Sequence, residues 1–148
     1  MTDNFLTRFF QVAQQVTRAE RGFALDTGFE VVATYNLDDS TLTERVFNDF
    51  AYTWLRRAME DNKPIITNNI ITDSRKAPDT NTGFSNLRVV VCIPLYGHGG
   101  FYLDQHIRNG IIPRNIIDRL GDAFYTLQKN QQADATVEDI LAVFNRMR

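Results

Sequence analysis

The chain has very little cysteine and no long apolar run, and both shortages limit what it can be. Its single cysteine, Cys92, cannot form an intrachain disulfide or a thiolate metal cluster. No apolar stretch approaches the roughly 20 residues that a membrane-spanning helix needs. The N-terminus, with Asp3 among short apolar pairs, does not have the pattern of a signal peptide. We therefore expect a cytoplasmic protein with no membrane partner.

An excess of charge of one sign is also missing. The 16 basic and 18 acidic side chains give a net charge of −2, and the longest basic run is Arg56-Arg57. Proteins that bind nucleic acids carry clustered Lys and Arg, so we expect no nucleic-acid partner. Apolar side chains are plentiful, at 43% of 148 residues with 11 Phe. This composition is enough for the core of a single domain.

Residue patterns typical of metal, phosphate-binding or catalytic sites are scarce. His98 and His106 have no HxxxH or CxxC partner at the spacing of a metal site. The run Gly97–Gly100 lacks the patterns of phosphate-binding loops. Cys92 stands in an apolar stretch, which favours an inert packing role. With no nucleophile–base pair or cofactor motif, we expect that the chain is not an enzyme and takes no metal or cofactor.

Apolar residues recur at helical spacing in four stretches of the chain. We expect helices at 4–18, 43–61, 114–128 and 136–147. Thr2 or Asp3 is the expected cap of the first helix, and Thr41–Glu44 has the form of a capping box for the second. Asn62-Lys63-Pro64 should end the second helix, because proline disfavours helical backbone in the residue before it.

Runs rich in strand-forming residues lie between these helices. We expect strands at 23–25, 29–35, 65–67, 89–95 and 101–104. Sequential strands with helices between them indicate an α+β domain. The polar stretch at 68–86 is predicted to be a long loop, and such loops are often functional.

Five segments of the chain resemble bacterial GAF domains, in the order and spacing of that family. They are Ala19–Asp26 (AERGFALD), Asn62–Ile65 (NKPI), Asp73–Arg75 (DSR), Leu87–Leu95 (LRVVVCIPL) and Gly99–Asp104 (GGFYLD). The resemblance covers about residues 4–128. It is closest to GAF domains found beside forkhead-associated, histidine-kinase or σ54-activator modules.

This resemblance implies a three-layer α/β/α fold with a central antiparallel sheet of about six strands and helices on both faces. The chain would divide into a GAF-like domain at 1–128, a linker at 129–135 and a C-terminal amphipathic helix at 136–148. The middle helix and the long loop would enclose a small-molecule pocket. Val89 in place of a small polar residue, and a short turn between Leu95 and Gly99, would narrow that pocket.

The predicted ligand site gathers apolar, hydroxyl and charged residues on that side of the sheet. Its members are Trp54, Asp73, Arg75, Phe84, Arg88 and Tyr102. An arginine offers a planar fork suited to a small anionic ligand. In the alternative interpretation, Asp73 or Asp79 pairs with an arginine and only fixes the loop.

We therefore expect a stand-alone sensor or interaction module that forms a homodimer and passes signals through protein partners. The expected dimer interface uses the first helix and the 114–128 helix, through Phe9, Val16, Leu120 and Leu127. The alternative is a ligand-free scaffold subunit with a closed pocket.

Overall fold

The computed structural model describes residues 4–37, 45–71 and 87–147, which form helices around one sheet. The helices are α1 (Phe5–Thr17), α3 (Arg45–Asp61), α4 (Arg114–Lys129) and α5 (Val137–Arg146), with a 3₁₀ turn, η2 (Ile107–Asn109). The strands are β1 (Arg21–Leu25), β2 (Val31–Tyr35), β3 (Ile65–Ile71), β4 (Leu87–Leu95) and β5 (Gly99–His106). The predicted α+β class is confirmed.

The sheet has the order β2-β1-β5-β4-β3, and every neighbouring pair is antiparallel. Within residues 4–37, 45–71 and 87–147 it contains five strands, whereas the GAF resemblance implied about six. The strand-forming runs of the sequence account for these five. After β5 the chain turns through η2 into α4.

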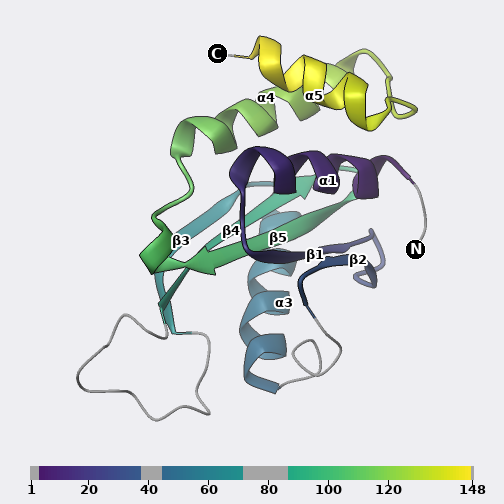
Figure 1. Cartoon of the computed structure of the whole chain (residues 1–148). Coiled ribbons are helices and arrows are strands. Elements are labelled where there is room, and N and C mark those ends of the chain that lie inside the picture. Colours follow the sequence, from purple (N-terminus) through teal and green to yellow (C-terminus); the bar gives the residue numbers. More distant parts are fainter. Residues whose placement is uncertain (1–3, 38–44, 72–86, 148) are drawn as a thin grey trace.

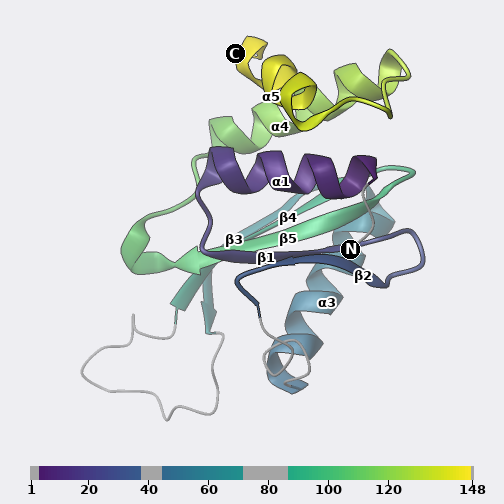
Figure 2. The same cartoon turned by 45° about the vertical axis from the view of Figure 1, so that its right-hand side comes forward.

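Helices cover both faces of the sheet. Figure 1 shows α1 and α4 on one face and α3 on the other. Figure 2 shows α5 lying over α1 and α4, outside the layer that touches the sheet. Arg8 of α1 ties down the segment before α5, because its Nε donates to the Ala135 carbonyl at 2.8 Å. Ile140 and Phe144 of α5 are buried in the same core as α1.

Helix boundaries follow mostly from local residues. The last helix was predicted from residue 136, and Thr136 is its cap, in a capping box with Asp139. The cap of α1 is Asn4, whose side chain accepts from the Thr7 amide at 2.9 Å. The prediction of Thr2 or Asp3 was therefore wrong. The proposed Thr41–Glu44 capping box lies outside the described residues.

Strand β3 is longer than its sequence suggested. It runs to Ile71, with a register irregularity between Thr67 and Ile70 where it pairs with β4. The prediction that the loop begins at Asn68 was wrong. Backbone N–H and C=O groups form the hydrogen bonds of a sheet, so a residue with a polar side chain can extend a strand. The rest of the predicted loop, 72–86, lies outside the described residues.

Alternation along β5 divides its side chains between two cores. Phe101 and Leu103 pack with α1 and α4, whereas Tyr102 packs with α3. Asp104 is two residues beyond Tyr102 and lies on the same face.

Within the described ranges, no helix is both long and apolar enough to cross a membrane.

Candidate functional site

The structure places only part of the predicted ligand site. Trp54 is half-buried on α3, and it packs against the core that contains Tyr102. Arg88 and Tyr102 lie on neighbouring strands β4 and β5, on the α3 side of the sheet. The other predicted members lie outside the described residues; they are Asp73, Arg75 and Phe84.

Arg88 and Tyr102 meet at a buried carboxylate that sequence reasoning did not single out. Asp104 is fully buried and accepts from the Tyr102 hydroxyl at 2.6 Å. Its Oδ1 lies 2.7 Å from Nε of Arg21 and 3.2 Å from Nη1 of Arg88. Arg21 stands directly opposite Asp104 in the pairing of β1 with β5, so strand register brings the two together.

Among the described residues, opposite charges in this cluster face one another. Arg88 lies 3.2 Å from Asp104 and 3.6 Å from Glu20, so two carboxylates face the two guanidinium groups of Arg21 and Arg88. An anion beside Arg88 would have to compete with a buried carboxylate that is already hydrogen-bonded. This arrangement favours a structural role for Arg88 over the predicted role of anchoring an anionic ligand.

The environment of the cluster shifts the pKa of its members. Burial raises the pKa of the Tyr102 hydroxyl, and the charge of Asp104 raises it further. Tyr102 therefore stays a neutral hydrogen-bond donor. Partial burial tends to raise the pKa of Glu20, but a hydrogen bond from the His106 amide and the charge of Arg88 outweigh this and lower it. Glu20 also accepts from the Asn109 side chain at 2.6 Å, which ties η2 to the start of β1.

Cys92 should react slowly with iodoacetamide in the native protein and rapidly in denaturant. Its side chain is fully buried, and burial together with the charge of Asp104 raises the pKa of the thiol. The reactive thiolate is therefore scarce even at the pH of about 8.5 where exposed cysteines ionise. Mass spectrometry of labelled protein measures the rate. Fast native labelling would contradict the burial of β4.

The residues expected at a dimer interface are used inside the chain. Phe9 and Leu120 are 0% exposed, and Leu127 is 1% exposed. Val16 is half-buried against the same core. These side chains belong to one core that the sheet, α1, α4 and α5 form together, which the apolar stripes alone do not reveal. Phe9, Leu120 and Leu127 therefore offer almost no surface to a second copy in this arrangement.

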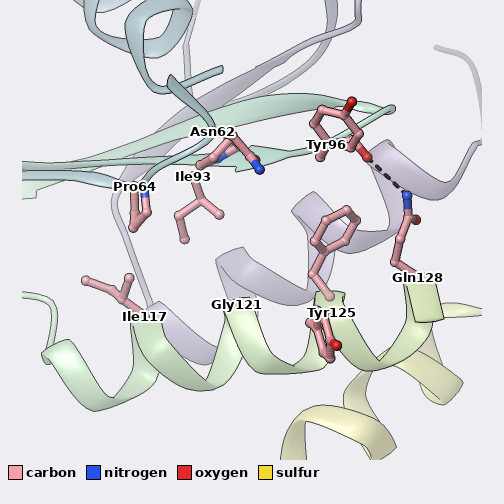
Figure 3. Close-up of a pocket in the computed structure, with 10 residues that line it drawn as sticks. Asn62, Pro64, Ile93, Tyr96, Ile117, Gly121, Tyr125 and Gln128 are labelled. Carbon is pink, nitrogen blue, oxygen red and sulfur yellow. Dashed lines mark hydrogen bonds between the residues drawn. The ribbon is translucent and has the colours of Figure 1, made fainter. Parts of the chain in front are cut away.

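A different part of α4 borders an open apolar groove of about 360 Å³. The groove lies between α4 and the part of the sheet where β3 begins and β4 ends (Figure 3). Its lining consists of Asn62, Pro64, Ile93, Pro94, Tyr96, Ile117, Gly121, Phe124, Tyr125 and Gln128. None of these side chains is charged. We call this feature the α4 groove.

Hydrogen bonds hold one end of the α4 groove in place. Gln128 Nε2 donates to the Tyr96 carbonyl at 3.2 Å, which is the dashed line in Figure 3. The other side-chain atom of Gln128, Oε1, lies 3.1 Å from His98 Nε2. The turn between β4 and β5 is thereby fixed to the C-terminal half of α4, and the groove is formed in advance of any binding.

Exposed aromatic residues stand at the rim of the α4 groove. Among the described residues, the exposed large apolar side chains are Tyr35, Tyr96, Ile111 and Tyr125. Tyr96 is 68% exposed and Tyr125 is 67% exposed, and both line the groove. Figure 3 shows the Tyr125 ring on the outer side of α4, away from Ile93. Two large aromatic surfaces beside an apolar hollow are typical of an interaction site.

Comparisons with protein-family models, with curated proteins and with solved structures found no match to this chain. The GAF resemblance therefore stays a prediction.

Sequence reasoning missed the α4 groove, although one signal was present. Gly121 interrupts an otherwise regular amphipathic helix, and glycine in a helix interior lowers stability relative to alanine. Ile117 is buried in the same core as Leu120, and Phe124 packs against that core, so both line the groove from the inward side of α4.

Proposed function

We propose that this chain is an interaction module, of the sensor or interaction type that its GAF resemblance suggests, and that it pairs with a second copy through the α4 groove. The observation that carries the proposal is an uncharged hollow flanked by two exposed tyrosines, Tyr96 and Tyr125. Tyrosine is enriched in protein interfaces and among the residues that contribute most of their binding energy.

A protein surface fits the α4 groove better than the anionic ligand predicted from sequence. The groove has no cationic side chain to receive an anion. Its walls are Pro64 and Ile93 on the sheet side and Ile117 and Phe124 on the helix side, so they favour apolar groups. On the opposite face of the sheet, Arg88 is compensated by Asp104. The proposal therefore includes no small ligand.

Self-association explains why large apolar surface is left on α4. Burying an exposed tyrosine side chain removes mostly apolar area from water, at roughly 25 cal/mol per Å². A two-fold symmetric pair buries each such residue twice, once in each copy. The side chains that contribute are then Tyr96 and Tyr125 rather than the buried Leu120 and Leu127.

Replacing Tyr125 with serine should weaken dimerisation at least tenfold, which corresponds to about 1.4 kcal/mol. The side chain is 67% exposed in the single chain, so the fold should lose little stability. Tyr96→Ser should act in the same direction. Sedimentation equilibrium across a dilution series gives the dissociation constant of each variant.

Tyr35→Ser is the matched control. Tyr35 is also an exposed tyrosine, but it lies on β2 at the opposite edge of the sheet from β3. Its replacement should leave the dissociation constant unchanged. A wild-type chain that stays monomeric when concentrated, or an equal loss in Tyr35→Ser, would refute the α4 groove as the pairing surface.

A further inference from the structure

A second hollow, separate from the α4 groove, lies between α4 and the C-terminal end of α5. Figure 2 shows α5 lying over α4, which brings this end of the chain beside the longer helix. The hollow has a volume of about 690 Å³, within the range of roughly 300–1,000 Å³ that is usual for small-molecule sites. Its lining consists of Asn115, Asp118, Arg119, Asp122, Asn145 and Met147. We call this feature the α4–α5 pocket.

Arg119 is fixed in the α4–α5 pocket but uses few of its hydrogen-bond donors. Its guanidinium carbon lies 4.1 Å from the centroid of the Phe144 ring, and Nη2 donates to the Phe144 carbonyl at 3.3 Å. Nε is buried and has no hydrogen-bond partner among the described residues. A guanidinium group has five N–H groups, and a buried donor without an acceptor is unfavourable. This orphan donor points to an absent acceptor.

Asp122 supplies an opposite charge that is also left without a partner. It follows Arg119 by three residues on α4, which is a spacing at which opposite charges often pair. The two do not pair, because Arg119 is turned onto Phe144 instead. Among the described residues Asp122 meets no cation, whereas Asp118 already lies 3.1 Å from Arg114. The pocket therefore presents one cation and one free carboxylate, held apart.

This arrangement suits a ligand that carries both charges. A carboxylate group fits the planar fork of Arg119, and an ammonium group fits Asp122. A ligand with only negative charge would lie beside two aspartates, and a ligand with only positive charge would leave the Arg119 donors unused. The side-chain amides of Asn115 and Asn145 both donate and accept, so they suit uncharged polar atoms of the same ligand.

We propose that the α4–α5 pocket binds a free α-amino acid, with its carboxylate on Arg119 and its ammonium group on Asp122. None of the residues that line this pocket lines the α4 groove. The inference therefore goes beyond the proposed function and does not depend on the pairing of two copies.

Titration of the ¹⁵N-labelled chain with amino acids tests the site. The chain is kept at one concentration, and each of the common L-amino acids is added to millimolar levels while amide chemical shifts are followed. At least one amino acid should give saturable shifts over 115–122 of α4 and 144–147 at the end of α5. If no amino acid gives saturable shifts there, water alone satisfies Arg119 and the proposal is overturned.

Derivatives of the tightest-binding amino acid test whether both charges are recognised. The N-acetyl derivative lacks the ammonium group, and the C-terminal amide lacks the carboxylate. Each should bind at least about tenfold more weakly, because each leaves one charged group of the pocket unmatched. An N-acetyl derivative that binds as tightly as the parent shows a carboxylate site, and an amide that does so shows a cation site. Either result overturns the assignment to a zwitterion.

Asp122→Asn should raise the dissociation constant of that amino acid at least about tenfold. The side chain is exposed, so the variant should keep the wild-type circular dichroism spectrum. Asp61→Asn is the matched control, because Asp61 is an exposed aspartate on α3, at the opposite face of the sheet (Figure 1). It should leave the dissociation constant unchanged. An unchanged value for Asp122→Asn, or an equal rise for Asp61→Asn, would overturn the role of Asp122.

Discussion

Asp104→Asn should lower the free energy of unfolding by about 3–5 kcal/mol, the usual cost of removing one partner from a buried ion pair. Asp104 is fully buried, and the side chains of Arg21 and Arg88 are only 17% and 20% exposed. Asparagine keeps the shape and can still accept from Tyr102, but it leaves two cations with one fewer carboxylate. The expected loss of stability therefore comes from the lost charge, because asparagine fills the same space and leaves no cavity.

Urea denaturation monitored by circular dichroism measures this loss, and Asp118→Asn is its matched control. Asp118 also pairs with an arginine, Arg114, but the two side chains are 58% and 71% exposed. Exposed pairs of this kind contribute at most about 0.5 kcal/mol. A loss of under about 1 kcal/mol for Asp104→Asn would contradict the stabilising role of the cluster.

Gly99→Ala should lower the free energy of unfolding by a similar amount, because the added methyl group clashes with the backbone. A Cβ at Gly99 would lie 2.0 Å from the Leu25 carbonyl oxygen, which is backbone and cannot rotate away. Its φ of +120° is also unfavourable for any residue with a side chain. Overlap of this kind costs about 1–3 kcal/mol and the strained backbone about 1–3 more. We expect the free energy of unfolding to fall by about 2–6 kcal/mol.

Gly121→Ala is the matched glycine control, measured at concentrations where the chain is monomeric. It adds the same methyl group in open space, so the helix should gain about 0.5–1 kcal/mol. The midpoint of urea denaturation should therefore fall for Gly99→Ala and rise for Gly121→Ala. If Gly99→Ala were as stable as the wild type, the tight turn from β4 into β5 would be placed wrongly.

Local residues predicted most of the fold. Pro64 and Thr136 mark helix ends that the structure has at those places, because a proline and a cap act through their nearest neighbours. The apolar run at 101–104 likewise predicted a strand, and it lies within β5. Strand β3 was underestimated because Asn68 and Asn69 are poor strand formers, and pairing with β4 decides where it ends.

The candidate site could not be predicted from neighbouring residues in the sequence. Asp104 meets Arg21 only because β1 and β5 pair in one particular register, over 83 residues of sequence separation. The α4 groove depends likewise on how the helix is placed against the sheet. Ile117 of α4 and Ile93 of β4 line it together, although 24 residues separate them in the sequence.

A dilution series of ¹⁵N-labelled protein, followed by amide chemical shifts, tests the pairing surface most directly. Our account predicts concentration-dependent shifts over 117–128 of α4, at the end of β4 and at the start of β3, with β2 unaffected. Shifts confined to β2 or to the outer face of α5, or no change with concentration at all, would contradict pairing through the α4 groove.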